Sequence, residues 1–260
     1  MGGTQAIRTG KDGRGGLGNV LSGIAVAIGF ALFLGGFAWG AVVYRPYMVP
    51  TDSMMPTVRP GDRVLAQRID GADVHRGDVV IFTDSQWSDS PMVKRVVGIG
   101  GDVVKCCGAV GELTVNGTPL DEPYADTTKP ETGLAMPPGQ TAPTGTPFEV
   151  AVPEGNLFLL GDRRSASLDS RAHLQEAGQG SVPRSAVSAR VDALAWPSVT
   201  MLERPATYAA LPGGISRPGP LRLQVVTVLA GAVLVALGAA YGPVVRVLAR
   251  GRQRERAGVR

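Results

Sequence analysis

Residues 92–99 read MVKRVVGI, an apolar run interrupted by Lys94 and Arg95. In a β-strand successive side chains point to opposite faces, so Lys94 would share a face with Met92 and Val96 while Arg95 points the other way. Burial among apolar groups disfavours the ammonium form and lowers the pKa of a lysine, so Lys94 is a candidate for a neutral, basic amine. The alternative is an edge-strand lysine that discourages aggregation.

Other short strand-like runs lie on both sides of this one, each bounded by Gly, Asp or Pro. They cover residues 62–69, 78–82, 102–104, 112–115, 118–120, 156–160 and 187–196. Asn116 and Gly117 favour a type I′ hairpin between two of them, because both turn residues need positive φ. Strong helix signals are lacking between residues 45 and 205, so we predict a mostly β, antiparallel domain there.

Two regions of this part of the chain are rich in Pro and Gly. Residues 124–153 show no clear period, and we predict a loop-rich insert with one strand at Phe148–Val152. Residues 206–222 are predicted to form a linker.

Two long runs carry no charge, at residues 15–44 and 223–245. A helix rises about 1.5 Å per residue, so roughly 20 apolar residues cross a bilayer core of about 30 Å. Both runs are therefore predicted to be transmembrane helices. A cleaved signal peptide is the alternative for the first, but its apolar core usually spans about 7–15 residues and this run is about twice that. An uncleaved anchor is favoured.

The flanking charges predict an orientation. Arg8, Lys11 and Arg14 lie in the basic tail at residues 1–14, and six arginines lie in the tail at residues 246–260. Basic segments beside membrane helices stay in the cytoplasm, so both termini are predicted inside and the intervening domain outside. Residues 45–222 hold 17 Lys and Arg against 20 Asp and Glu, a net charge of −3. The basic residues thus flank the membrane helices, and no nucleic-acid partner is expected.

Cys106 and Cys107 are the only cysteines. A disulfide is permitted outside the cell, but adjacent Cα atoms lie about 3.8 Å apart, so a bridge between them would be strained. Two free cysteines and one bridged pair both stay open. Neither has a Cys or His partner at metal-ligand spacing, and no phosphate-binding loop is present, so no metal or other cofactor is predicted.

Ser53 lies in the stretch PTDSMMPT at residues 50–57, between two prolines. A serine hydroxyl is a poor nucleophile until a base removes its proton. The chain has two histidines, of which His75 lies in a polar turn. His173 follows Asp169 and Arg171, which also permits a Ser-His-Asp arrangement. Lys94 is the other candidate base. A dense polar cluster, GDRRSASLDSR at residues 161–171, directly follows the predicted strand 156–160.

The three stretches, taken in order behind an N-terminal anchor, closely resemble the bacterial type I signal peptidases. These Ser/Lys enzymes remove signal peptides at the outer face of the cytoplasmic membrane. The resemblance covers roughly residues 45–196, and the second span resembles the arrangement in some high-GC Gram-positive bacteria. It implies that Ser53 is the nucleophile and Lys94 the general base. The hydroxyl of Thr51 would help the Ser53 amide stabilise an oxyanion.

The resemblance also implies supporting residues. Ser167 would orient the lysine amine, and Asp162, Asp169 and Arg171 would form a salt-bridged shell around the site. A shallow apolar pocket would accept small residues, chiefly Ala, one and three positions before the cut. The implied lining residues are Tyr47, Val49, Met54, Val58, Met92 and Val93.

Several positions depart from the family pattern, among them Ser165 and Ala166, which replace a polar pair. Arg163 stands where an Asn is usual, and Asp52, beside the nucleophile, stands where a small residue is more common. A carboxylate pointing into the site would raise the pKa of Lys94, so we expect Asp52 to face solvent.

The sequence therefore predicts an antiparallel β catalytic domain at residues 45–205, anchored by an N-terminal and a C-terminal transmembrane helix. Its predicted function is to remove N-terminal signal peptides from secreted preproteins, with signal peptides and the lipid bilayer as partners. Oligomeric state is left unassigned. One alternative is a catalytically silent, membrane-anchored module that binds signal peptides or assists secretion. Another is a self-cleaving repressor on the same Ser/Lys plan, but such repressors are soluble and the two spans argue against it.

Overall fold

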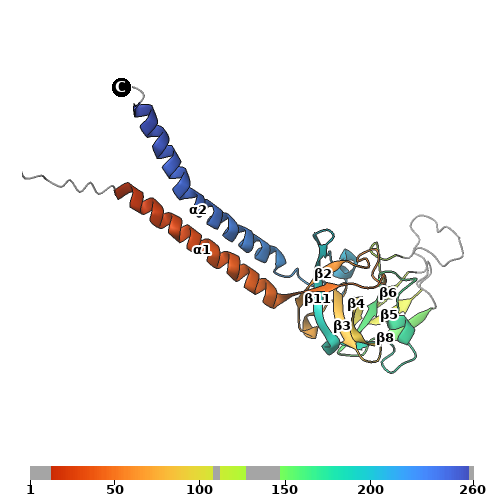
Figure 1. The fold of residues 1–260 in the computed structure, drawn as a ribbon. Helices are drawn as coiled ribbons and strands as arrows, with labels where there is room; N and C mark the ends of the chain where they lie inside the picture. Colours follow the sequence, from red (N-terminus) through yellow and green to blue (C-terminus); the bar gives the residue numbers. More distant parts are fainter. Residues whose placement is uncertain (1–12, 108–111, 127–146, 258–260) are drawn as a thin grey trace, which may run out of the picture. The chain divides into compact units, whose positions relative to one another are not determined.

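The computed structural model describes residues 13–107, 112–126 and 147–257. It divides into two compact units, which are described separately. One unit contains two long helices, and the other runs from Val43 to Gly219 and contains the sheets (Figure 1).

The helical unit contains α1 (Gly13–Val43) and α2 (Leu221–Ala257). Gly18–Val43 and Leu221–Val245 are long and apolar enough to cross a membrane, each with a mean hydropathy of 2.2. These segments agree with the predicted spans at residues 15–44 and 223–245. The second helix differs from the prediction at its end, because it continues through the arginine-rich tail as far as Ala257.

Small residues bring α1 and α2 together side by side (Figure 1). The backbones approach so closely that a Cβ built on Gly29 would lie 2.8 Å from the carbonyl oxygen of Gly231. Nearer the start of α1, the Ser22 hydroxyl donates a 2.7 Å hydrogen bond to the Gly238 carbonyl. Nearer its end, Gly36 faces Val228. Residue numbers rise along α1 while those of the contacting residues on α2 fall, so the two helices are antiparallel. Close approach through small residues is a common way for membrane helices to pack.

The second unit is built from two antiparallel sheets, which confirms the predicted fold class (Figure 1). The larger follows the order β1-β2-β11-β3-β4-β9-β10, with β12 paired to β11. Its strands are β1 (Tyr44–Met48), β2 (Arg63–Arg68), β3 (Val79–Asp84), β4 (Ser88–Ile99), β9 (Asn156–Leu160), β10 (Val182–Pro183), β11 (Val187–Trp196) and β12 (Thr200–Met201). The smaller has the order β7-β6-β5-β8. Its strands are β5 (Val103–Cys106), β6 (Thr114–Val115), β7 (Thr118–Pro119) and β8 (Phe148–Ala151).

The predicted hairpin lies between β6 and β7. Asn116 and Gly117 both have positive φ, at 52° and 77°, as a type I′ turn requires. The strand predicted at Phe148–Val152 corresponds to β8, whereas most of the predicted insert, residues 127–146, lies outside the described residues. Cys106, the last residue of β5, is joined to Cys107 by a disulfide, so the bridged alternative is the one found.

The core explains why β3 and β4 are central. Val79 and Ile81 of β3 pack with Val49 and Met54 on one face of the sheet. Val80 and Phe82 pack with apolar side chains of β4 and β9 on the other. Because β3 is covered on both faces, it lacks the polar alternation of a half-exposed strand.

The segment predicted as a linker packs against the β domain instead. Tyr208 is fully buried in an apolar cluster with residues of β5 and β9, and Leu211 is also buried there. Farther along, the Ser216 hydroxyl donates to the buried carboxylate of Asp78. Proline and glycine content alone suggested a free chain, but these side chains anchor the segment as far as Gly219.

A buried carboxylate ties the first strand to this same segment. Asp192 of β11 accepts hydrogen bonds from the Tyr44 hydroxyl at 2.7 Å and from Arg204 Nη2 at 2.6 Å. Gly219 lies against them, since a Cβ built on it would come within 2.0 Å of an Asp192 oxygen and 2.4 Å of the Tyr44 hydroxyl. The first residue of β1 and the last residue of the domain are thus neighbours.

Candidate active site

Ser53 lies in a turn that follows β1 and is fixed at several points. Val49 exchanges backbone hydrogen bonds with the returning chain, donating to the Asp62 carbonyl at 2.9 Å and accepting from the Gly61 amide at 2.8 Å. On the other side, the Arg163 amide donates to the Ser53 carbonyl at 3.0 Å. The next side chain, Met54, is fully buried. These contacts hold Ser53 in place although the turn itself is not a strand.

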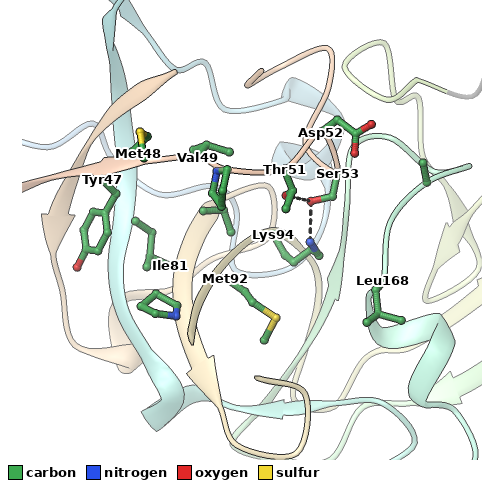
Figure 2. A pocket seen from close by; sticks show the side chains of 14 residues that line it. Tyr47, Met48, Val49, Thr51, Asp52, Ser53, Ile81, Met92, Lys94 and Leu168 are labelled. Carbon is green, nitrogen blue, oxygen red and sulfur yellow. Dashed lines mark hydrogen bonds between the residues drawn. The ribbon is translucent and has the colours of Figure 1, made fainter. Parts of the chain in front are cut away.

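Lys94 reaches this serine from the centre of β4. Its Nζ donates to Ser53 Oγ at 2.8 Å, and the two side chains meet beside the pocket (Figure 2). Ser53 is 7% exposed and Lys94 5%. Burial lowers the pKa of Lys94; Asp169 and Asp162 oppose this shift and Arg171 adds to it. The net direction is downward, which favours the neutral amine that a general base needs.

Thr51 lies on the same turn as Ser53. Its Oγ1 is 3.3 Å from Ser53 Oγ, close enough for a hydrogen bond in which either hydroxyl can donate (Figure 2). Among the hydrogen bonds of the described residues, none is donated by the Ser53 amide. This amide and the Thr51 hydroxyl both lie close to the candidate nucleophile, as the predicted oxyanion role requires. That role stays a prediction.

The loop after β9 closes the site from the other side. Gly161 lies where a Cβ would come within 2.0 Å of Ser167 Oγ and 2.6 Å of the Ser53 carbonyl oxygen, so only glycine fits without a shift. Ser167 Oγ is buried and makes no hydrogen bond of acceptable geometry within the described residues. It nevertheless lies close enough to Asp169 to help lower the pKa of that carboxyl. The predicted contact of Ser167 with the Lys94 amine is absent from this structure, and its orienting role stays a prediction.

Asp162 is paired with Arg95, the neighbour of the candidate base. Arg95 Nε and Nη2 donate to the two carboxylate oxygens at 2.8 and 2.6 Å, and both side chains are buried. Arg95 Nη1 donates to the Gly77 carbonyl, and the guanidinium lies 4.1 Å from the centre of the Tyr124 ring. Burial opposes the charge of Arg95, but Asp162 outweighs it and raises the pKa of this arginine. As the alternation predicted, Lys94 and Arg95 point to opposite sides of β4.

Asp169 has a separate arginine partner. Arg171 Nε and Nη2 donate to it at 2.9 and 2.7 Å, and the Gly161 amide donates at 3.0 Å. Burial alone would raise the pKa of Asp169, but its bonds with Arg171 lower it. The predicted polar shell is therefore two pairs, Asp169 with Arg171 and Asp162 with Arg95.

A third buried pair was not predicted from the sequence. Arg164 donates to both carboxylate oxygens of Glu122, at 2.6 and 2.7 Å, and its Nε donates to the Gly161 carbonyl. Tyr124 donates to the same carboxylate and hydrogen-bonds Tyr208. Arg164 lies within the polar motif at residues 161–171, but its partner Glu122 is 42 residues away, so the motif alone does not reveal the pair.

An open pocket of about 490 Å³ lies beside Ser53 and Lys94. Of the six predicted lining residues, Tyr47, Val49, Met92 and Val93 do line it. Met54 and Val58 do not; both are fully buried in the core beneath it. Further side chains that the sequence reasoning did not select complete the wall: Met48, Pro50, Ile81, Pro91, Ala166 and Leu168.

Asp52 and Arg163 form an ion pair. Asp52 lines the pocket and its side chain is 45% exposed, so it neither lies fully in solvent nor is enclosed. Figure 2 shows its carboxylate beside Ser53 and pointing away from the Lys94 amine.

The histidines have partners elsewhere. His173 Nδ1 contacts Glu176 at 2.8 Å, and its ring stacks on Trp87 with centroids 4.4 Å apart. His75 Nδ1 contacts the Asp73 carbonyl. Neither ring is found in contact with Ser53, so of the candidate bases only Lys94 hydrogen-bonds it. No group of three or more His, Cys, Asp or Glu residues suited to a metal ion occurs within the described part of the chain.

A serine hydroxyl held against a buried amine beside an open pocket is the arrangement that a serine hydrolase with a lysine base requires. Comparisons with known proteins show the family to which the chain belongs. The family model described as "Signal peptidase, peptidase S26" matches residues 19–196. The chain therefore belongs to the signal peptidase family, peptidase S26.

Individual relatives carry the same description. Signal peptidase I of Mycobacterium tuberculosis is 30% identical over 221 residues, which cover 68% of this chain and 71% of the relative. Signal peptidase I U of Bacillus subtilis is 36% identical over 135 residues, covering 50% of this chain and 66% of the relative. Signal peptidase IB of Staphylococcus aureus is 32% identical over 157 residues, covering 57% and 78%. With two apolar helices long enough to span a bilayer, this member of the family is a membrane protein.

Proposed function

We propose that this chain is a membrane-anchored serine endopeptidase that removes N-terminal signal peptides from exported preproteins, with Ser53 as nucleophile and Lys94 as general base. The observation that carries the proposal is the 2.8 Å contact between Lys94 Nζ and Ser53 Oγ in a buried setting. Membership of the signal peptidase family supports the choice of substrate.

The first half of the reaction forms an acyl-enzyme. The neutral Lys94 amine takes the proton from Ser53 Oγ, and the oxygen attacks the carbonyl carbon of the scissile bond. Negative charge then develops on the carbonyl oxygen, where the Ser53 amide and the Thr51 hydroxyl can donate hydrogen bonds. When the tetrahedral intermediate collapses, the carbon–nitrogen bond breaks and the Lys94 ammonium gives its proton to the leaving amine of the mature protein.

The second half releases the signal peptide. Lys94 takes a proton from water, and the resulting hydroxide oxygen attacks the ester carbonyl. The ester bond to Ser53 then breaks, and the lysine returns the proton to Ser53 Oγ. The signal peptide leaves with a new carboxylate, and the enzyme is restored. Throughout, the pairs Asp162–Arg95 and Asp169–Arg171 hold the loop that faces the serine.

The pocket is suited to small apolar side chains. Val49, Ile81, Met92 and Val93 give it apolar walls, which exclude polar and bulky groups more effectively than they separate small ones. The substrate would lie along the sheet edge as an extended strand, held by main-chain hydrogen bonds. At the rim Met48 and Leu168 are about two-thirds exposed, and they offer apolar contact to the substrate or to lipid.

The proposed topology follows from the charges. Both basic tails lie in the cytoplasm, and the β domain lies on the outer side of the membrane. The packed segment around Tyr208 extends that domain from the predicted limit at residue 205 to Gly219.

The test is cleavage of a preprotein with an Ala-x-Ala site by the full-length protein in detergent. Ser53→Ala and Lys94→Ala should each abolish cleavage while the protein still folds and inserts. Ser90→Ala and Lys105→Ala are matched controls, because both side chains lie on the surface, and they should retain activity. If purified wild-type protein binds the preprotein without cutting it, the chain is the silent binding module. Turnover by Lys94→Ala would move the base role to His173 or another group.

A further inference from the structure

Asp52 and Arg163 lie 111 residues apart in the sequence, yet their side chains contact each other. Asp52 immediately precedes the nucleophile, and Arg163 lies in the loop after β9. Arg163 Nη1 donates to Asp52 Oδ2 at the rim of the pocket, with 34% of the arginine and 45% of the aspartate side chain exposed. Ion pairs this exposed add little to stability, so the pair calls for a different explanation.

Arg163 contacts the nucleophile segment a second time through its backbone. Its amide donates to the Ser53 carbonyl at 3.0 Å. The backbone of Arg163 is therefore fixed beside Ser53, and its side chain binds the preceding residue, Asp52. The ion pair between the two side chains is therefore not needed to hold the Arg163 backbone in place. The Asp52 carboxylate that Arg163 binds points away from the Lys94 amine (Figure 2).

The direction of that carboxylate matters because the site needs an uncharged lysine. Asp162 and Asp169 favour the ammonium form of Lys94, and Arg171 opposes it. Asp162 is bound by Arg95 and Asp169 by Arg171. Asp52 is a third carboxylate at the site, and Arg163 is its arginine. Each carboxylate beside the dyad thus has one arginine that holds it.

We propose that Arg163 is a positioning residue that holds the Asp52 carboxylate away from the Ser53–Lys94 pair. Without the arginine, rotation of the Asp52 side chain would turn a free carboxylate toward the Ser53–Lys94 pair, where it would stabilise the lysine ammonium and obstruct the substrate. This inference rests on the proposed function, but the position of the carboxylate can be measured without turnover.

The experiment compares Arg163→Gln in two backgrounds, native Asp52 and Asp52→Asn. The first readout is the pH dependence of kcat/KM for preprotein cleavage. An unpaired carboxylate within about 4–6 Å shifts a neighbouring pKa by roughly 1–3 units. With native Asp52, Arg163→Gln should therefore move the acid limb upward by about one pH unit and lower kcat/KM at neutral pH about tenfold. In the Asp52→Asn background, Arg163→Gln should lower kcat/KM by less than about twofold, because the carboxylate is gone.

The second readout is the titration of Lys94 itself. The chain has four lysines, at positions 11, 94, 105 and 129, so competitive labelling with acetic anhydride over a pH series can be read for each one by mass spectrometry. Lys105, which is exposed, serves as the internal reference. Arg163→Gln should raise the labelling midpoint of Lys94 only when Asp52 is present. Arg163→Lys should keep most of the wild-type midpoint, because an ammonium still holds the carboxylate.

An equal loss of kcat/KM in both backgrounds, with an unchanged Lys94 midpoint, would overturn the inference and make Arg163 a loop clamp. If the wild-type protein cleaves nothing, the proposed function fails. The labelling midpoints then still decide this inference, since a shift that depends on Asp52 supports it and the lack of one refutes it.

Discussion

Replacing Lys94 with Met tests whether burial lowers the pKa of the Lys94 amine and so favours its uncharged form. The unfolded chain has an ordinary lysine with a pKa of 10.5, whereas burial lowers the pKa in the folded protein. Between these two values the unfolded state binds more protons than the folded state, so wild-type stability rises with pH. Methionine has a similar length and no charge, so the variant lacks this dependence.

The magnitude follows from proton linkage. In that pH window the wild type should gain about 1.4 kcal/mol of unfolding free energy per pH unit relative to Lys94→Met. The variant should therefore be the more stable protein near neutral pH, and its advantage should shrink as the pH approaches 10.5. Loss of the hydrogen bond to Ser53 subtracts a constant amount, on the order of 1 kcal/mol, which leaves the slope unaffected.

The assay is urea unfolding of the detergent-solubilised full chain at several pH values between about 7 and 9.5, followed by the fluorescence of Trp87 and the other tryptophans. Lys105→Met is the control, because this lysine is 55% exposed in its pair with Glu149. Its stability difference from wild type should stay flat across the series. If the Lys94→Met difference is equally flat, the lysine titrates normally and the reasoning about the general base is wrong.

Four further outcomes are expected. Asp162→Asn leaves the Arg95 guanidinium buried without its carboxylate, and the free energy of unfolding by urea should fall by about 3–5 kcal/mol, whereas a fall below about 1 kcal/mol would contradict the buried pairing. Gly161→Ala forces Ser167 and the Ser53 carbonyl to shift, so kcat should fall by tenfold or more with little change in KM; an unaffected kcat would speak against the close packing. Gly29→Leu should reduce chemical cross-linking between cysteines placed at positions 22 and 238, whereas Gly35→Leu, which faces open space, should leave the yield unchanged. Cleavage should increase with pH along an acid limb whose midpoint lies below 10.5, because Lys94 must lose its proton to act as the base. Arg171→Gln should move that midpoint upward, because the positive charge of Arg171 lowers the pKa of Lys94.

Local signals in the sequence account for much of the fold. The alternation of side chains around Lys94 predicts that Lys94 and Arg95 point to opposite faces of the strand. The turn at Asn116 and Gly117 can be predicted from these two residues alone. Strand β1 was missed because Tyr44–Met48 follows the apolar span directly and contains a proline. The Pro and Gly content around Tyr208 predicts a linker, because the burial of this single aromatic residue depends on distant strands.

The candidate site divides in the same way. Ser53 and Lys94 stand in motifs that can be recognised from their order along the chain, and the structure brings the two side chains into contact. The partners of the buried charges cannot be predicted from sequence motifs, because Asp162 lies 67 residues from Arg95 and Glu122 lies 42 residues from Arg164. Such pairs depend on which strands become neighbours. The family resemblance implies that Met54 and Val58 line the pocket, whereas the structure buries both side chains in the core.

The contact of Tyr44 with Gly219 through Asp192 has a practical consequence. A folded unit whose two ends meet can be excised, closed into a ring by a short peptide, or reopened at a surface turn such as the one at Asn116. Residues 44–219 are thus a candidate for circular permutation, in which new termini replace the membrane connections and the sheet order is kept.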